Sequence, residues 1–245
     1  MNKKRVLLVS EAHYLHSGFG TYSKELLSRL HNTNKYELAE FASYGKYEST
    51  GGTPWLFYAN LPNDGDAEGQ NVYNSTTGHQ FGAWRFDKVC LDFKPDIVLC
   101  YRDPWMDNWI AGSPSRPYFH WVWMPTVDSA PQRQEWVDTF CKCDAVLAYS
   151  EFGGKVLKEQ GKEGINYIGC ASPGIDPKIY KPLPKGDHRK DMGLDPDCFI
   201  VGTVMRNQKR KLFFELMKSF RLFLDRSPPE IAAKTFLYLH TSYPE

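Results

Sequence analysis

The sequence has no long hydrophobic run and almost no net charge, and each absence excludes a class of protein. Residues 1–5 are basic but are followed by only four apolar residues, 6–9, whereas a secretory signal peptide needs about 7 to 15. No stretch approaches the roughly 20 apolar residues of a membrane-spanning helix. Thirty lysines and arginines against 29 aspartates and glutamates give a formal charge of +1. No global field therefore attracts nucleic acid or an anionic membrane, and any bound anion must be held locally.

Cysteine is also scarce, and its spacing argues against a zinc or redox site. The only close pair has the pattern C-x-C, whereas zinc and redox sites use C-x-x-C. We therefore expect reduced, structural thiols in a cytoplasmic protein. The six residues are Cys90, Cys100, Cys141, Cys143, Cys170 and Cys198.

What the sequence does contain is a regular alternation of short apolar runs and helical periods. At 245 residues and 42% hydrophobic content, the chain can bury one core of about 150 to 200 residues with material left over. The alternation predicts right-handed crossovers and an open parallel, Rossmann-like sheet. Strands are expected at residues 5–10, 38–42, 55–59, 97–101, 118–124, 145–149 and 166–170, and helices at 22–30, 83–93, 133–141 and 150–160.

The last part of the chain begins a second α/β domain. Residues 176–196 carry four prolines and six basic residues without a sustained period, which indicates a linker. A strand at 199–204, a helix at 212–224 and a strand at 235–240 follow. Because such a sheet usually has five or six strands, we expect only the opening of a second domain, with apolar surface that another chain would cover. The expected division is residues 1–180, a linker 181–198, and a partial domain 199–245.

A glycine turn, Gly18-Phe19-Gly20, separates the first strand from the first helix. In a doubly wound sheet this position presents backbone amides and a helix N-terminus to an anion. Gly18 and Gly20 would let the backbone approach a phosphate or a sugar hydroxyl. Ser23 occupies the third glycine position of G-x-G-x-x-G, so the dinucleotide fingerprint is incomplete. A plain strand-to-helix turn accounts for the same residues.

A basic segment, residues 206–211, follows the strand at 199–204 and begins the next helix. Arg206 and Lys211 would lie at the carboxyl end of that strand, where open α/β sheets bind ligands. A guanidinium and an ammonium can neutralise a diphosphate leaving group. A solvated basic helix start is the alternative, but cations near a helix N-terminus are mildly unfavourable. We therefore favour a diphosphate site.

Together these stretches resemble the retaining glycosyltransferases of the two-domain GT-B superfamily, specifically the group called family 4. The resemblance covers nearly the whole chain. It rests on the glycine turn, on Lys-Pro-Asp-Ile-Val at 94–98, on residues 144–151 with Pro-Gly-Ile-Asp at 173–176, and on residues 201–211. Each stretch is weak alone, but their order and spacing are specific.

The resemblance implies an acceptor-side domain at residues 1–180 facing a donor-side domain at 199–245. It implies transfer of a hexose from a nucleotide diphospho-sugar to a glycan, lipid or protein acceptor, with retention of configuration and without a metal or other cofactor. Arg206 and Lys211 would hold the donor diphosphate, and Gly18 and Gly20 would face the same cleft. The glutamate-rich donor motif of the family is missing, so we expect a truncated enzyme that binds its donor poorly.

The candidate catalytic residues lie near the strand expected at 118–124. The family commonly has a histidine just past this strand, close to the reacting sugar, and the sequence departs from that pattern. His120 falls within the strand between two aromatic residues, so we expect its side chain to be packed. We favour Asp128, in the following loop, as the polar group near the sugar, with His120 as the second candidate. A helix-cap role would equally account for Asp128.

The preceding strand ends in Tyr101-Arg102-Asp103, which adds charge and aromatic surface at the same edge of the sheet. We expect these three residues to bind the acceptor. A helix N-cap by Asp103, with Pro104 at the first helical position, explains part of the pattern without a ligand.

Three alternatives stay open. Two D-x-D motifs, at residues 64–66 and 195–197, would suit a metal-dependent glycosyltransferase of the single-domain type, but neither follows a hydrophobic strand. The chain could also be a non-catalytic sugar- or nucleotide-binding module that works with a partner. An epimerase acting on a nucleotide sugar shares the same fold.

Overall fold

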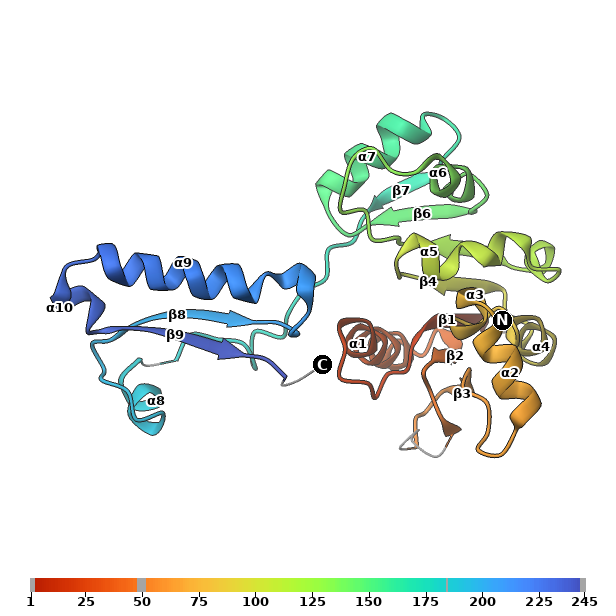
Figure 1. Ribbon diagram of the computed structural model, residues 1–245. Coiled ribbons are helices and arrows are strands. Elements are labelled where there is room, and N and C mark those ends of the chain that lie inside the picture. The colour runs from red at the N-terminus through yellow and green to blue at the C-terminus, as the bar shows by residue number, and fades with distance from the viewer. Residues whose placement is uncertain (1–2, 48–51, 184, 243–245) are drawn as a thin grey trace. The chain divides into compact units, whose positions relative to one another are not determined.

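The computed structural model describes residues 3–47, 52–183 and 185–242, and the chain divides into two compact units (Figure 1). Unit 1 is Met1–Gly174 and unit 2 is Ile175–Glu245. Residues 1–2, 48–51, 184 and 243–245 fall within the predicted domain and linker ranges but lie outside the described part. The segment predicted as a linker contains a helix, α8 (Lys185–Asp191). Its polar sequence has no apolar period, so the hydrophobic pattern gave no sign of it.

Unit 1 is built on a parallel sheet with the strand order β3-β2-β1-β4-β5-β6-β7. The chain adds β2 and β3 on one side of β1 and then adds the remaining strands on the other side. This doubly wound topology confirms the predicted open parallel sheet. The strands are β1 (Lys4–Glu11), β2 (Tyr36–Ser43), β3 (Leu56–Ala59), β4 (Ile97–Cys100), β5 (His120–Trp123), β6 (Ala145–Ala148) and β7 (Tyr167–Cys170).

Helices connect the strands of unit 1, and the four longer predicted ones are present. Ser150 caps α7 as expected, because its hydroxyl accepts a hydrogen bond of 3.1 Å from the backbone N–H of Gly153. The predicted helices are α1 (Gly18–Asn32), α4 (Phe86–Phe93), α6 (Gln134–Phe140) and α7 (Glu151–Gly161). Short helices that the pattern did not reveal are α2 (Ala67–Ser75), α3 (Thr77–Gln80), η2 (Asn108–Gly112) and η3 (Arg116–Tyr118). Another short helix, α5 (Pro104–Asp107), begins at Pro104, as the N-cap alternative for Asp103 implied.

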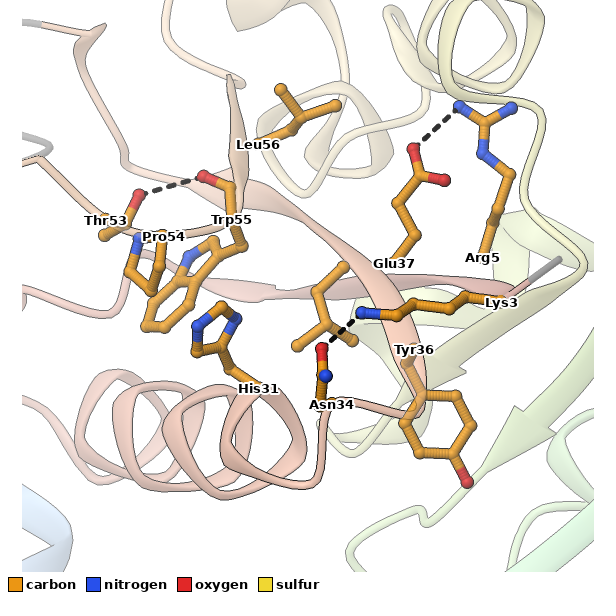
Figure 2. A pocket seen from close by; sticks show the side chains of 11 residues that line it. Lys3, Arg5, His31, Asn34, Tyr36, Glu37, Thr53, Pro54, Trp55 and Leu56 are labelled. Carbon is orange, nitrogen blue, oxygen red and sulfur yellow. Dashed lines mark hydrogen bonds and ion pairs between the residues drawn. The ribbon is translucent and has the colours of Figure 1, made fainter.

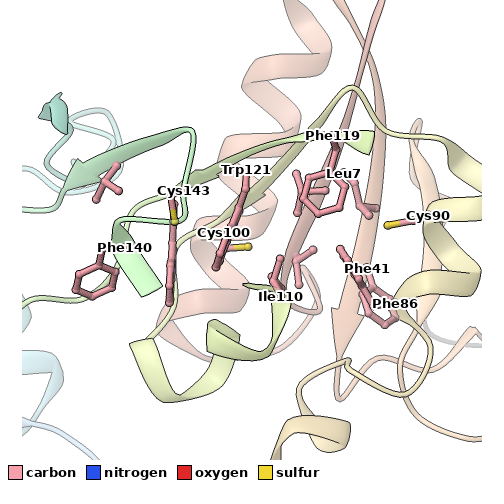
Figure 3. Close-up of a cluster of buried hydrophobic side chains, with 14 of the residues drawn as sticks. Leu7, Phe41, Phe86, Cys90, Cys100, Ile110, Phe119, Trp121, Phe140 and Cys143 are labelled. Atoms are coloured by element: carbon pink, nitrogen blue, oxygen red, sulfur yellow. The ribbon is translucent and has the colours of Figure 1, made fainter. Parts of the chain in front are cut away.

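The core of unit 1 covers both faces of the sheet. Side chains alternate along a strand, so Leu7 and Val9 of β1 enter one cluster, whereas Val6 and Leu8 enter the other with Leu27 of α1. Figure 3 shows the larger cluster, in which aromatic side chains and buried cysteines pack together. All six cysteines are unpaired. Burial raises the pKa of the Cys90 thiol to about 12, so this thiol stays protonated.

Two aspartates at the starts of strands attach those strands to their neighbours. Asp96, directly before β4, accepts a hydrogen bond of 2.8 Å from the backbone N–H of Arg5 and another from Lys4. Asp144, directly before β6, accepts one of 2.7 Å from the backbone N–H of Trp121. Two of the stretches that carry the family resemblance thus have a structural role in joining parallel strands.

We predict that protonation of the Asp96 carboxylate lowers the stability of unit 1 in acid. Hydrogen bonds from Arg5 and Lys4 lower the pKa of Asp96 in the folded protein. The stability that this ionised carboxylate adds is therefore complete above the unfolded-state pKa of about 3.9, and it is lost as pH falls through the folded-state pKa. We expect Asp96→Asn to be less stable at neutral pH and to show a flatter decline in acid. Urea unfolding followed by tryptophan fluorescence measures this, because all seven tryptophans lie in unit 1. An equally steep decline in Asp96→Asn would contradict the assignment, and Asp64→Asn, whose side chain is 89% exposed, is the control.

Unit 2 contains a parallel pair of strands, β8 (Phe199–Val204) and β9 (Thr235–His240), as predicted. The connection runs through η4 (Lys209–Lys211), α9 (Phe213–Arg226) and α10 (Pro229–Ala232). Among its described residues only Cys198 and Thr235 are buried, whereas Phe199 is 63% exposed and other large apolar side chains are exposed with it. Such surface is unusual for a folded domain in isolation.

Among the described residues, no helix has both the length and the apolar character needed to cross a bilayer.

Candidate functional site

The switch in strand order between β1 and β4 marks the candidate ligand edge of unit 1. In doubly wound sheets, ligands bind beyond the carboxyl ends of the strands at this point. The segments that meet there are the loop from β1 to α1, residues 12–17, and the segment after β4, residues 101–103.

Hydrogen bonds fix the loop after β1 to the end of β1 and to the first turns of α1. Ser17 is the N-cap of α1: its hydroxyl accepts a hydrogen bond of 3.0 Å from the N–H of Gly20 and donates one to the carboxylate of Glu11. The hydroxyl of Ser23 donates to the backbone carbonyl of Glu11 at 2.7 Å and lies 2.5 Å from that of Tyr101. The glycine turn therefore has a rigid frame with a half-exposed carboxylate beside it.

The two glycines of the turn differ in their surroundings. Gly18 is exposed, and a Cβ built on it would meet no atom within 4 Å. Gly20 is buried, and a Cβ there would lie 2.6 Å from the carbonyl oxygen of Leu15 and 2.8 Å from that of Ala12. Gly20 is thus required by packing against the loop, whereas Gly18 leaves the surface open.

Alanine substitutions at Gly18 and Gly20 are expected to have opposite effects on the stability of unit 1. Because the atoms that a Cβ on Gly20 would meet belong to the backbone, Gly20→Ala should lower the free energy of unfolding by about 1–3 kcal/mol. Gly18→Ala should leave it unchanged or raise it by about 0.4–1 kcal/mol, since alanine restricts the unfolded chain. Urea titrations of both variants test this, and equal stabilities would refute the packing role of Gly20.

A buried carboxylate holds the other end of the same loop. Glu40 of β2 is fully buried and accepts hydrogen bonds from the N–H of His13 at 2.7 Å and from the indole of Trp55 at 3.1 Å. Its second contact with His13 is 2.8 Å from the Nδ1 atom. Glu40 was not among the residues predicted for the site, although a single carboxylate within the apolar run 38–42 is the signal that could have revealed it.

The first two residues after β4 are buried and support the fold. This corrects the prediction that residues 101–103 together form an acceptor surface. The side chains of Tyr101 and Arg102 are fully buried. Arg102 forms a buried ion pair with Asp107 of α5 and donates a hydrogen bond of 2.6 Å to Ser43. Asp103 remains half-exposed at the start of α5, where its carboxylate accepts from the hydroxyl of Thr126 and not from the helix backbone. Of the three residues, only Asp103 is accessible to a ligand.

The two candidate catalytic residues lie at opposite ends of β5. His120 is its first residue, at the amino edge of the sheet, and its imidazole is 76% exposed and 3.6 Å from Asp144. The prediction of a packed His120 is therefore wrong, because the strand begins there and no element of the described residues covers its side chain. Asp128 lies exposed in the loop after β5, at the carboxyl edge, and the helix that follows begins only at Gln134 with Arg133 as its N-cap. The helix-cap alternative for Asp128 is thereby removed.

Two tyrosines at the carboxyl edge are embedded in the protein. The hydroxyl of Tyr149 donates to the backbone carbonyl of Tyr101. Burial raises the pKa of Tyr101 and the pKa of Tyr149 well above the usual range. Both hydroxyls therefore stay neutral and act as hydrogen-bonding supports.

In unit 2, the loop from β8 to α9 gathers cations at the carboxyl end of β8. Arg206, Lys209 and Arg210 are exposed and Lys211 is half-buried. Within the described part of the chain, none of these four side chains has a hydrogen-bond or ion-pair partner. The side-chain oxygen of Gln208, in the same loop, is buried without a partner.

The helix that follows this loop begins without a side-chain cap. Leu212 is the N-cap of α9, and its φ of 55° is unusual for a branched residue. The first N–H groups of the 14-residue helix thus lack a side-chain acceptor, and a helix N-terminus of this kind favours an anion. Together with the unpaired cations, this arrangement suits a phosphate group.

The two D-x-D motifs have local roles. Asp66 caps α2 by accepting a hydrogen bond of 2.8 Å from the N–H of Gly69. Asp195 accepts one of 2.8 Å from the N–H of Asp197 within a turn. The Asp66 carboxylate therefore caps a helix, and the Asp195 carboxylate stabilises a turn.

A groove of about 880 Å³ lies on the opposite edge of unit 1 (Figure 2). Lys3, Arg5 and Glu37 line it at the amino ends of β1 and β2, together with Trp55. Arg5 and Glu37 pair at 3.4 Å, and Lys3 donates to Asn34, so the charged groups in the groove are already partnered. We place the candidate site of unit 1 at its carboxyl edge because the strand order switches there, between β1 and β4.

No protein-family model and no curated protein matches the sequence. Solved structures match nearly the whole chain. A sucrose-phosphate synthase from Thermosynechococcus elongatus gives a TM-score of 0.67 at 14% identity over 97% of this chain and 62% of its own. A UDP-N-acetylglucosamine 2-epimerase from Rickettsia bellii gives 0.62 at 14% identity over 99% and 63%. Anabaena HepE, solved in complex with UDP, gives 0.60 at 13% identity over 98% and 62%.

These matches, together with the sheet topology, confirm the predicted fold class: an α/β fold of the GT-B type with a Rossmann-like parallel sheet. The chain spans about 62% of the length of the sucrose-phosphate synthase. Proteins of this fold among the matches include both glycosyltransferases and nucleotide-sugar epimerases.

Proposed function

We propose that the chain belongs to a nucleotide-sugar-dependent glycosyltransferase in which unit 2 binds the donor diphosphate and unit 1 binds the acceptor. The observation that carries the proposal is the loop from β8 to α9, where Arg206 and Lys211 are unpaired cations beside an uncapped helix N-terminus. Transfer of a glycosyl group leaves negative charge on the departing diphosphate, and positioned cations stabilise that charge. UDP bound to HepE, a protein of the same fold, supports this ligand class.

The finer assignment follows the family 4 resemblance: transfer of a hexose with retention of configuration, and no metal requirement. Asp128 is its candidate near-sugar group, since it lies exposed at the carboxyl edge, whereas His120 lies at the opposite edge of the sheet. Gly18 would keep the acceptor side of unit 1 open. The exposed apolar side chains of unit 2, Phe199 among them, support a further chain segment or partner chain packed against this unit in the working enzyme.

A direct test is calorimetric titration of the chain with UDP, GDP, ADP and their common diphospho-sugars in the presence of EDTA. At least one nucleoside diphosphate should bind without a metal, and donor hydrolysis or transfer should yield a product whose anomeric proton signal shows retention. Absence of binding by every nucleotide, both to this chain and to a form that includes the segment packed against unit 2, would refute the proposal. Inverted product would refute the retaining assignment alone.

An epimerase is the second candidate, because an enzyme of that class has the same fold over 99% of this chain. It would use the same diphosphate subsite but would change the sugar of UDP-N-acetylglucosamine without an acceptor. Proton NMR of that nucleotide sugar, incubated with the protein alone, separates the two: a new sugar spin system with the nucleotide still attached indicates epimerisation. A third candidate, a non-catalytic module, predicts nucleotide binding with neither reaction.

A further inference from the structure

Two half-exposed aromatic rings stand at the carboxyl edge of unit 1, beside the switch point. Tyr44 directly follows β2 and is 39% exposed, and Trp105 lies in α5 after β4 and is 43% exposed. Both contact the buried ring of Phe81 edge-on, with centroid distances of 5.8 Å and 5.1 Å. The two rings therefore flank one buried ring and present apolar surface at the edge where ligands bind.

Tyr44 has a backbone conformation that a bulky residue rarely adopts. Its φ is 59°, in the left-handed region, where glycine is the residue without a steric cost. The turn is closed by a hydrogen bond of 3.1 Å from the N–H of Gly45 to the carbonyl of Ala42. Strain of this kind recurs at functional sites, where the surrounding structure maintains it. A tyrosine here is unfavourable for the turn but presents its ring at the edge of the sheet.

Two half-exposed carboxylates accompany the rings. Glu11 is the last residue of β1, where it pairs in register with Ser43, the residue directly before Tyr44. Asp103 lies two residues before Trp105. Glu11 accepts a side-chain hydrogen bond from Ser17 and Asp103 one from Thr126. An ionised carboxylate has room for about four such bonds, so both can accept further hydroxyl donors.

The cations near these groups already have partners. Arg102 is fully buried and paired with Asp107, and Lys46, two residues after Tyr44, pairs with Asp64 at 3.2 Å. A phosphate at this edge would therefore meet two carboxylates and cations that are already paired. A sugar ring fits better, because its C–H face stacks on the electron-rich face of an aromatic ring and its hydroxyls donate to carboxylates.

We propose that Tyr44, Trp105, Glu11 and Asp103 form a subsite for an uncharged sugar, which is the acceptor if the proposed glycosyltransferase function holds. The subsite selects against sugar phosphates. The rings supply the contact surface, and the carboxylates orient the hydroxyl groups. Of the three residues expected from sequence it keeps Asp103, whereas Tyr101 and Arg102 support it from within the protein.

Saturation-transfer NMR tests the subsite with glucose, galactose, mannose and N-acetylglucosamine, each beside its 6-phosphate. At least one neutral sugar should receive saturation, about tenfold more than its phosphate, as expected for a charge that meets unpaired carboxylates. Trp105→Ala and Tyr44→Gly should abolish the signal, and Trp105→Phe should retain it. Tyr44→Gly relieves the positive φ, so its loss of signal is not due to unfolding. Tyr118→Ala, at an 82% exposed ring on the opposite edge, should change nothing.

Three results would overturn the inference: no saturation of any neutral sugar, equal or stronger signals from the phosphates, or full signals in Trp105→Ala and Tyr44→Gly. UDP titration of the same samples separates this inference from the proposed function. Binding of UDP with selection of sugar phosphates leaves the glycosyltransferase proposal intact and removes the neutral subsite. Binding of neutral sugars without any nucleotide removes the acceptor role.

Discussion

Alanine at both Arg206 and Lys211 is expected to weaken binding of UDP by about 100-fold, because each charged hydrogen bond to a phosphate contributes about 1.4 kcal/mol or more. We use the lower end of the usual range since Arg206 is exposed and water screens its charge. Each single variant should lose about tenfold. Arg206→Lys should lose nearly as much as Arg206→Ala, since only a guanidinium offers two parallel donors to a phosphate. Titration calorimetry at fixed ionic strength measures all four variants.

The control for this prediction removes the same charge elsewhere in unit 2. Lys218 and Arg221 lie on α9, where Lys218 is 4.3 Å from the ring of Phe214 and Arg221 pairs with Asp225. Lys218→Ala with Arg221→Ala should leave UDP affinity within about twofold, because only long-range, screened charge changes. An Arg206→Ala, Lys211→Ala variant that binds UDP like the unmodified protein would refute the diphosphate subsite.

The largest loss of stability is expected on replacing Asp107, the partner of the buried Arg102 guanidinium. Asp107→Ala leaves Arg102 charged and unpaired in the interior, and we expect the free energy of unfolding of unit 1 to fall by about 3–5 kcal/mol. The double variant Arg102→Met, Asp107→Leu removes both charges and should recover most of that loss. Urea unfolding followed by tryptophan fluorescence measures each variant.

An exposed ion pair provides the comparison for Asp107. Glu135 lies 3.6 Å from Arg133, and both side chains are more than half exposed. Glu135→Ala should cost at most about 1 kcal/mol. If Asp107→Ala cost no more than Glu135→Ala, the buried pair would not hold α5 against the sheet, and the frame beneath Asp103 and Trp105 would need another explanation.

The regular parts of the fold were predictable because hydrophobic periodicity determines them. The strands β8 and β9 were located to the residue, since each is an apolar run between polar segments. Helices α2 and α8 were not found, because both are polar and leave no apolar stripe. The Asp66 side chain caps α2. Sequence periodicity thus indicates which segments enter the core and says little of those that lie over its edges.

The site residues were harder to predict because their roles depend on partners distant in sequence. The buried state of Arg102 follows from Asp107 and from Ser43, which comes from another strand. Tyr44 falls in a loop-rich segment, and neither its positive φ nor its contact with Phe81 has a sequence signal. The carboxyl edge itself was predicted, because strand order and the glycine turn indicate it without knowledge of side-chain contacts.

The topology of unit 1 also has a consequence for synthesis on the ribosome. The first of these strands, β1, is third in the order of the seven-stranded sheet, and the later strands are added outward on either side of it. Unit 1 is continuous through Gly174, so its whole sheet has been translated before β8 emerges. Translation proceeds at about 5–20 residues per second, and N-terminal domains generally fold first. Unit 1 can therefore mature while the nascent chain is still growing, without waiting for the segment that carries Arg206 and Lys211.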